Sequence, residues 1–209
     1  MHIHALSHSN ILPTEFTHCS GMIMNYTPTK KPVYIIYTKN NYLYLSLSFL
    51  LSSSGTLHIT DINNLKLYKY SGSGVILDLQ GETSLTPSVM SDINSILPEC
   101  IFILSSFKIK GLNSVSPVRF FTKQITLKNF ILLINRREEV CDRFIPISLR
   151  QYRILVDILS GMDAYDIANK AEISVTTVYV YKKNIMKIME VRNDAALLKH
   201  PACLEIIHP

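Results

Sequence analysis

Residues 147–199 read ISLRQYRILVDILSGMDAYDIANKAEISVTTVYVYKKNIMKIMEVRNDAALLK, and this stretch divides into four amphipathic segments. In order, the segments begin at Ser148, after Asp163, at Ser174 and near Asn193, and the last one ends before Pro201. Serine, aspartate and asparagine at such positions cap helices, and Gly161 suits the end of the first segment. A tight connection at Ile173 joins the second segment to the third. The pattern predicts an all-α domain of four helices that contains a helix-turn-helix.

The third segment, residues 174–189, has two chemically different sides. At a spacing of about 3.6 residues, one side collects Val178, Tyr181, Ile185, Ile188 and Met189. The other side carries Thr176, Tyr179, Val180, Lys183 and Lys187. The segment contains lysines and no acidic residue, which favours an approach to phosphate groups. A helix that only separates a core from solvent would show the same two sides.

The order and spacing of these residues resemble the DNA-binding domain of LuxR/FixJ-type bacterial transcription regulators. The shared motifs are Ile147-Ser148-Leu149-Arg150-Gln151, Gly161, Asp166-Ile167-Ala168, Ile173-Ser174-Val175-Thr176-Thr177-Val178 and Asn184-Ile185. The chain departs from the family pattern at Tyr181, where a histidine is usual, and at Gln151 and Arg153, where paired glutamates are usual. The resemblance implies that residues 174–189 form a helix that enters the major groove of duplex DNA.

This resemblance assigns roles to seven residues of that helix. The positions that contact base edges in the family are occupied here by Tyr179, Val180 and Lys183. The positions that contact phosphates are occupied by Thr176, Thr177, Lys182 and Lys187. Lys183 is the best candidate for a donor to guanine, a contact worth about 1–3 kcal/mol of discrimination. Tyr179 replaces a lysine of the family, so the target sequence is expected to differ while the mode of binding is retained.

Residues 32–137 alternate short apolar runs with helical patterns. Strands are expected at 33–37, 56–60, 75–79, 100–104 and 118–121, and helices at 41–53, 61–70, 87–97 and 125–137. The segment around Gly111 is expected to be a loop or weak turn. Apolar strands that alternate with helices are typical of a parallel sheet buried on both faces. The predicted fold is therefore an α/β domain with a five-stranded, parallel, doubly wound sheet, followed by the all-α domain.

This α/β half resembles a degenerate receiver domain of response regulators. The matching positions are Asp78 for the phosphoacceptor, Ser105 or Ser106 for the hydroxyl and Lys123 for the lysine. Receivers hold Mg²⁺ with an acidic pair after the first strand, where this chain has Thr38-Lys39. One remaining carboxylate makes a poor magnesium site, so we expect no phosphorylation of Asp78. Lys39 could replace the metal and pair with Asp78, or Asp78 could simply end a strand near solvent.

The composition and the cysteines restrict the class of protein. Among 209 residues, 47% are hydrophobic and 18% are charged, which is typical of a globular chain. The cysteines, Cys19, Cys100, Cys141 and Cys203, are isolated, so we expect free thiols and no zinc site. The sequence shows no secretory signal, and its longest apolar run is too short to span a membrane, so a cytoplasmic protein is expected. We expect no metal, no cofactor and no enzymatic activity, because Asp78 lacks a second acid or base.

The predicted organisation has five parts. They are a flexible leader (1–31), a receiver-like domain (32–137), a linker (138–146), the helix-turn-helix domain (147–200) and a tail (201–209). The predicted function is a cytoplasmic, nucleoid-associated transcription regulator that binds double-stranded DNA as a homodimer and without phosphorylation. The alternative is an interaction module that forms a heterodimer with another LuxR-type regulator and modulates its activity. Apolar surface on the front half would support a dimer, unless all of that surface is core.

Overall fold

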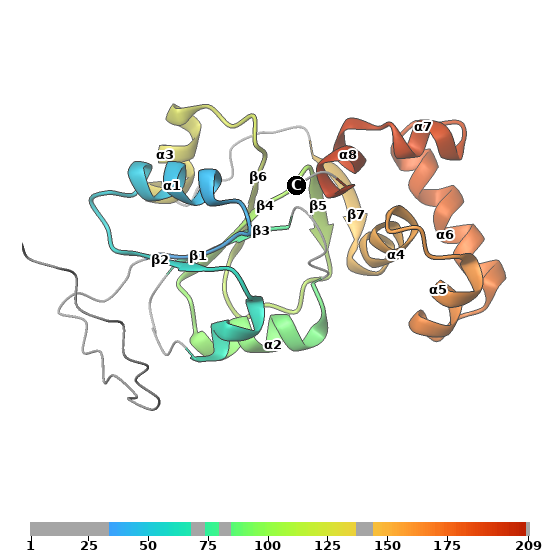
Figure 1. The fold of residues 1–209 in the computed structure, drawn as a ribbon, viewed down its shortest axis with the longest axis horizontal. Helices are drawn as coiled ribbons and strands as arrows, with labels where there is room; N and C mark the ends of the chain where they lie inside the picture. Colours follow the sequence, from blue (N-terminus) through green and yellow to red (C-terminus); the bar gives the residue numbers. More distant parts are fainter. Residues whose placement is uncertain (1–33, 68–73, 80–84, 137–143, 208–209) are drawn as a thin grey trace, which may run out of the picture.

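The computed structural model describes residues 34–67, 74–79, 85–136 and 144–207, which form a sheet domain and a helical bundle (Figure 1). The strands of the main sheet are β1 (Tyr34–Tyr37), β2 (Thr56–Ile59), β3 (Gly74–Asp78), β4 (Cys100–Leu104) and β6 (Val118–Phe121). They pair in parallel in the order β2-β1-β3-β4-β6. The predicted five-stranded parallel sheet is confirmed. The predicted leader, most of the predicted linker, and Cys19 and Cys141 lie outside the described residues.

Helices cover both faces of this sheet. One face packs against α1 (Asn41–Leu50) and α3 (Leu127–Arg136), and the other against the 3₁₀ helix η1 (Ile62–Leu67) and α2 (Pro87–Ile96). Successive residues of a strand point to opposite faces, so Ile35 and Ile36 belong to two different cores. Both cores are apolar, which explains why the strands are continuous hydrophobic runs in the sequence.

The chain forms no helix between β4 and β6. Instead the Ser105 hydroxyl accepts a hydrogen bond from the amide of Phe107 (3.0 Å), and the strand β5 (Phe107–Lys110) begins at once. This strand pairs in parallel with β7 (Ile145–Ser148), which leads directly into the helical bundle. A loop or weak turn was expected around Gly111, and this was wrong for Phe107–Lys110, which forms a strand. The last two residues of the predicted linker, 145 and 146, belong to β7. Phe107–Lys110 does alternate apolar and charged residues, which is the pattern of a half-buried strand.

The bundle contains the four expected helices and one more. The helices are α4 (Leu149–Leu159), α5 (Ala164–Ala171), α6 (Val175–Ile188), α7 (Asp194–Leu198) and α8 (Pro201–Ile207). The first four are capped by Ser148, Asp163, Ser174 and Asn193, as the sequence indicated. Ser148 forms a full capping box with Gln151, because each side chain bonds the backbone N–H of the other. The helix α8 occupies the segment for which a tail was expected.

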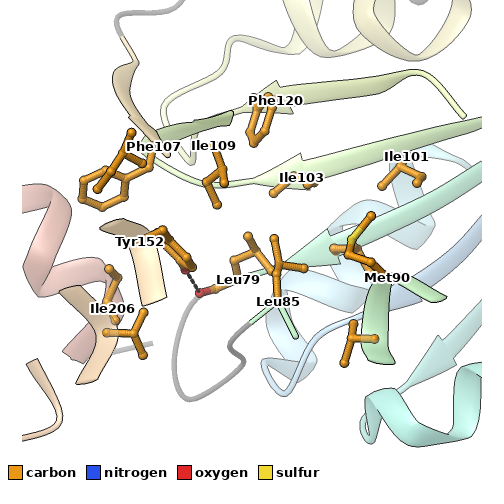
Figure 2. Packing of buried hydrophobic residues seen from close by; sticks show 14 of the residues in the cluster. Leu79, Leu85, Met90, Ile101, Ile103, Phe107, Ile109, Phe120, Tyr152 and Ile206 are labelled. Atoms are coloured by element: carbon orange, nitrogen blue, oxygen red, sulfur yellow. Dashed lines mark hydrogen bonds between the residues drawn. The ribbon is translucent and has the colours of Figure 1, made fainter. Parts of the chain in front are cut away.

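One hydrophobic core runs from the sheet into the bundle (Figure 2). It joins Leu79 and Ile103 of the sheet domain, Phe107 of β5, Tyr152 and Leu155 of α4, Ile185 and Met189 of α6, and Cys203 and Ile206 of α8. The rings of Phe107 and Tyr152 pack edge to face with centroids 6.0 Å apart. No helix between β4 and β6 covers this part of the sheet, and the bundle covers it instead. Within the described ranges, no helix combines the length and apolar character needed to cross a bilayer.

Because α8 is part of this core, replacing Ile206 with alanine should destabilise the whole protein. Truncation of a buried isoleucine costs about 2–5 kcal/mol of unfolding free energy. Leu204 lies on the exposed side of the same helix, so Leu204→Ala should change stability by only about 0.5 kcal/mol. Urea unfolding of the two variants checks the expectation, and a loss for Ile206→Ala as small as that expected for Leu204→Ala would show that α8 is only peripheral.

Candidate nucleic-acid interface

The helix α6 is positioned by a tight turn that follows α5. Glu172 ends α5 in the left-handed conformation (φ 51°), and Ser174 then caps α6 by accepting a hydrogen bond from the amide of Thr177 (3.1 Å). The buried side of α6 packs in two places. Val178 contacts α4 and α5 through Ile154, Ile167 and Ala168, while Ile185 and Met189 enter the core shared with the sheet domain. Both ends of α6 are thereby fixed against other elements.

The residues expected to contact base edges lie on the free side of this helix. Tyr179 is 58% exposed and Val180 is 52% exposed, and Lys183 is exposed one turn further along. Thr176 and Lys187 extend the exposed surface at either end. In Figure 1, α5 and α6 lie at the edge of the molecule away from the five-stranded sheet. The packing of the bundle on the sheet domain therefore leaves this surface uncovered by the described residues.

Two of the residues expected to contact phosphates have partners within the protein. The Lys182 ammonium donates to the carboxylate of Asp194 at 2.6 Å, which is an ion pair between α6 and α7. The Thr177 hydroxyl hydrogen-bonds the Ser174 hydroxyl at 2.7 Å. Both groups would have to exchange or share these partners to contact a phosphate, whereas Lys183 and Lys187 are exposed.

Arg150 adds a cation that the sequence analysis did not assign. Its guanidinium lies 5.8 Å from the centre of the Tyr181 ring and donates to the carbonyl of Ala171 at 3.4 Å. A cation above an aromatic face is attracted by the ring quadrupole. Tyr181, which stands where the family usually has a histidine, therefore contacts Arg150 in this chain. Arg150 belongs to the motif Ile147-Ser148-Leu149-Arg150-Gln151, so the sequence did contain a signal for a cation at this place.

The pocket expected around Asp78 is occupied by protein groups. Asp78 is only 5% exposed and accepts a 2.6 Å hydrogen bond from the hydroxyl of Thr38, which is also buried. Lys39 and Lys123 have exposed side chains, and the hydroxyl of Ser105 is used to begin β5. Among the described residues, no three His, Cys, Asp or Glu side chains gather where they would hold a metal ion. The Asp78 carboxylate is thus buried and accepts a hydrogen bond from a neighbouring hydroxyl.

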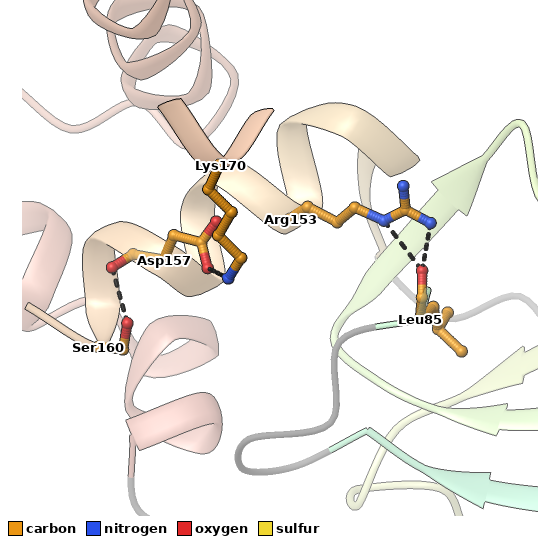
Figure 3. Close-up of polar contacts among 5 residues, drawn as sticks. All are labelled: Leu85, Arg153, Asp157, Ser160 and Lys170. Carbon is orange, nitrogen blue, oxygen red and sulfur yellow. Dashed lines mark hydrogen bonds and ion pairs between the residues drawn. The ribbon is translucent and has the colours of Figure 1, made fainter. Parts of the chain in front are cut away.

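The first helix of the bundle makes polar contacts to the chain on either side of residues 80–84. The Tyr152 hydroxyl donates to the carbonyl of Leu79 at 3.4 Å (Figure 2). The Arg153 Nε donates to the carbonyl of Leu85 at 2.9 Å, and a second guanidinium nitrogen donates to the same oxygen (Figure 3). Burial, and to a lesser degree the charge of Asp78, raises the pKa of Tyr152 above its ordinary value. The bundle thus contacts the segment that follows the Asp78 position.

Comparisons with known proteins agree with this architecture. Residues 33–142 match the family described as GadE/DctR transcriptional regulator, N-terminal domain, and residues 146–200 match the family described as bacterial regulatory proteins, luxR family. The HTH-type transcriptional regulator DctR of Escherichia coli strain K12 is 27% identical over 169 residues, which cover 80% of this chain and 96% of that protein. The corresponding protein of Shigella flexneri is 26% identical over the same length.

Solved structures share the fold at low sequence identity. The structure of two RcsB dimers bound to two parallel DNAs gives a TM-score of 0.58 at 18% identity and covers 81% of this chain and 97% of that one. The structure of the two-component response regulator RcsB–DNA complex gives a TM-score of 0.52 at 18% identity, covering 82% and 99%. At this identity the likeness concerns the fold.

The raised pKa of Tyr152 predicts a pH dependence of stability. In the unfolded chain the Tyr152 phenol loses its proton around its ordinary pKa of 10.0, whereas the folded state keeps the phenol protonated at higher pH. The contribution of this pKa difference to the free energy of unfolding is therefore complete below pH 10.0 and is lost as the pH rises above it. Tyr152→Phe should therefore lose less unfolding free energy than the wild type between about pH 9 and about pH 11, by up to about 1.4 kcal/mol per pH unit. Urea unfolding across this range measures the difference.

Tyr165→Phe is the matched control, because Tyr165 is exposed on α5. Its stability should follow the wild-type pH dependence. If Tyr152→Phe also follows it, burial of the Tyr152 phenol has no such effect.

Proposed function

The chain belongs to the GadE/DctR transcriptional regulators, with a luxR-family DNA-binding domain at residues 146–200, and we propose that it regulates transcription by placing α6 in the major groove of duplex DNA. The observation that carries this proposal is the exposed surface of Tyr179, Val180 and Lys183 on a helix whose opposite side is buried. We place this activity in the cytoplasm, on nucleoid DNA.

The chemistry of the exposed residues suits both base and phosphate contacts. Lys183 is a flexible donor that matches the O6 and N7 acceptors of guanine, and Val180 offers an apolar contact to a thymine methyl group. Tyr179 adds a hydroxyl and an aromatic ring at the neighbouring position. Thr176 and Lys187 lie at the two ends of this surface, where phosphate contacts would fix the orientation of the helix. Thr177 and Lys182 would join them by exchanging their partners within the protein.

A homodimer is proposed through α1 and α3. The helix α1 has no charged residue, although Tyr42 is 84% exposed and Phe49 is 78% exposed. Leu127 and Ile131 of α3 are exposed too, and both helices pack on one core on the same face of the sheet (Figure 1). The apolar residues available for this surface are Tyr42, Leu45, Phe49, Leu127 and Ile131. Exposed apolar side chains gathered on one face of a protein are typical of sites that contact a partner.

A second copy of the chain is the partner that fits this surface best. The structurally similar RcsB is described as dimers bound to DNA. Two copies related by a two-fold axis would present two α6 helices to two half-sites, which doubles the contacts with DNA. The surface of α1 and α3 is formed by the sheet domain, so it is available while α6 contacts DNA.

Phosphorylation is proposed to be unnecessary for this activity. Asp78 is buried, is hydrogen-bonded to Thr38, and lies close enough to the Tyr152 phenol for its charge to affect the phenol pKa. The exposed surface of α6 is already free while the bundle contacts the sheet domain. Incubation with acetyl phosphate is therefore expected to add no phosphate to the protein by intact-mass analysis and to leave its DNA affinity unchanged. A phosphate adduct on Asp78 would contradict the proposal.

The alternative function is a heterodimer with another LuxR-type regulator. Two observations favour it: Tyr179 stands where the family has a lysine, and the Lys182 charge is neutralised by Asp194. Both reduce the positive charge available to a lone binder. The salt dependence of binding to nonspecific duplex DNA separates the functions, because a lone binder loses affinity steeply as salt displaces its phosphate contacts.

Lys183→Ala should lose affinity for the specific site. Loss of a contact to guanine costs about 1–3 kcal/mol, which is about a 5- to 150-fold change in the dissociation constant. Lys187→Ala should instead weaken all sequences alike and reduce the salt slope by about one. Sequencing of genomic DNA retained by the purified protein identifies the site, and titration with that site measures each variant.

The control for both variants is Lys123→Ala, which removes an exposed lysine from the sheet domain. Its DNA affinity should equal that of the wild type. No enriched two-fold motif from folded wild-type protein would reject the homodimer and favour the heterodimer. An enriched motif that Lys183→Ala retains in full would reject the assignment of the base contact.

The proposed dimer surface predicts that Phe49→Asp yields a monomer. A charge at the centre of an apolar contact would have to be buried without a partner, which is costly. Analytical ultracentrifugation measures the mass in solution. Val115→Asp changes another exposed apolar residue, in the loop before β6, and should remain dimeric. A wild type that is monomeric at all concentrations, or a dimeric Phe49→Asp, would rule out this surface.

A further inference from the structure

A cavity of about 710 Å³ lies between the sheet domain and the bundle. Its walls come from the start of α2, the end of β5, one side of α4 from Leu149 to Asp157 and the end of α5. Small-molecule sites have volumes of about 300–1,000 Å³ and occur preferentially at domain interfaces. A second cavity of about 230 Å³ shares Pro87, Leu149 and Arg153 with the first. The position and size of the larger cavity therefore suit a small ligand that touches both domains.

The charged residues of this cavity are mainly basic. Four basic side chains line it, namely Lys110, Arg150, Arg153 and Lys170, against the two acidic side chains of Asp157 and Glu172. Lys170 and Asp157 neutralise one another through a 2.6 Å ion pair (Figure 3). In the part of the chain that the structure describes, Lys110, Arg150 and Arg153 form no ion pair with a carboxylate. The cavity consequently has an excess of positive charge.

Arg153 is the most constrained of these cations. Its polar contacts are to the carbonyl of Leu85, which is a neutral acceptor, and they use two of its five N–H donors. Burial lowers the pKa of Arg153, because a low-dielectric surrounding disfavours its charge. An anion close to a partly desolvated guanidinium forms charge-assisted hydrogen bonds, which are about twice as strong as neutral ones. An anionic ligand would therefore be favoured here.

The remaining walls are apolar. Pro87, Leu149 and Ile154 line the same cavity. A ligand that carries both an anionic group and an apolar part would fit the two kinds of wall better than an inorganic ion or an uncharged compound. Arg150 also contacts the carbonyl of Ala171 and the ring of Tyr181, so one wall of the cavity is connected to α5 and α6.

We propose that this cavity binds a small organic anion, whose carboxylate or phosphate group contacts Arg150, Arg153 and Lys110. Because the ligand touches both domains, its binding stabilises their contact and the protein as a whole. The cavity is distinct from the exposed surface of Tyr179, Val180 and Lys183, and Arg150 connects it to α6 through the Tyr181 ring.

The test uses the full chain without DNA, so that its result does not depend on the proposed function. Phenyl phosphate and phenylacetate serve as anionic probes, and 2-phenylethanol serves as the uncharged probe of similar shape. Isothermal titration calorimetry at millimolar probe should show binding of at least one anion and no binding of the alcohol. The anion that binds should also raise the thermal unfolding temperature. Preference for one anion identifies a phosphate or a carboxylate as the recognised group.

Two variants locate the site. Arg150→Gln and Lys110→Gln should each weaken binding of the anion by about tenfold, the effect of losing one charge-assisted hydrogen bond. The Lys110 side chain has no hydrogen bond or ion pair among the described residues, so its variant keeps the test valid if Arg150→Gln folds poorly. Lys128→Gln removes an exposed lysine from α3 and should bind as the wild type does. Failure of both anions to bind, or unchanged binding by Lys110→Gln and a folded Arg150→Gln, would overturn the proposal.

Discussion

The parallel pairing of β5 with β7 is the contact on which the arrangement of the two domains depends. It directs the chain from the sheet domain straight into α4, whose Tyr152 then packs against Phe107. Because no helix lies between β4 and β6, part of the sheet face would otherwise remain exposed and apolar. The bundle covers that surface with α4, α6 and α8, so the two domains share one core. The shared core fixes the orientation of the two domains when the chain folds, because separating them would expose apolar side chains to water.

This shared core explains how the two sides of α6 acquire different roles. Ile185 and Met189 are needed for contact with the sheet domain, whereas Tyr179, Val180 and Lys183 remain exposed. A helix that contacted the sheet domain with its lysine side would have to be released before it could bind DNA. In this chain the contact uses the apolar side, so the surface proposed to bind DNA and the contact between domains are compatible.

The Asp78 region shows how a receiver-like sheet is retained without its acidic pair. The Thr38 hydroxyl stabilises the carboxylate, and the Tyr152 hydroxyl from the bundle reaches the carbonyl of the next residue, Leu79. Both contacts are made by hydroxyl groups of this chain, so the end of β3 is tied to Thr38, which directly follows β1, and to α4. The sheet therefore serves here as a support for the bundle and for the apolar surface of α1 and α3.

The sequence by itself determined the elements with strong local signals. Ser148, Asp163, Ser174 and Asn193 marked helix starts because a cap acts within three residues, and the apolar runs marked the five strands of the main sheet. The exposed side of α6 followed from its periodicity. Only the tertiary structure determined β5 with β7, the helix α8 and the contacts of Arg153. Each depends on a partner distant in the sequence: Phe107–Lys110 is a strand because Ile145–Ser148 lies beside it, and Ile206 is core because β5 and α4 are there to cover it.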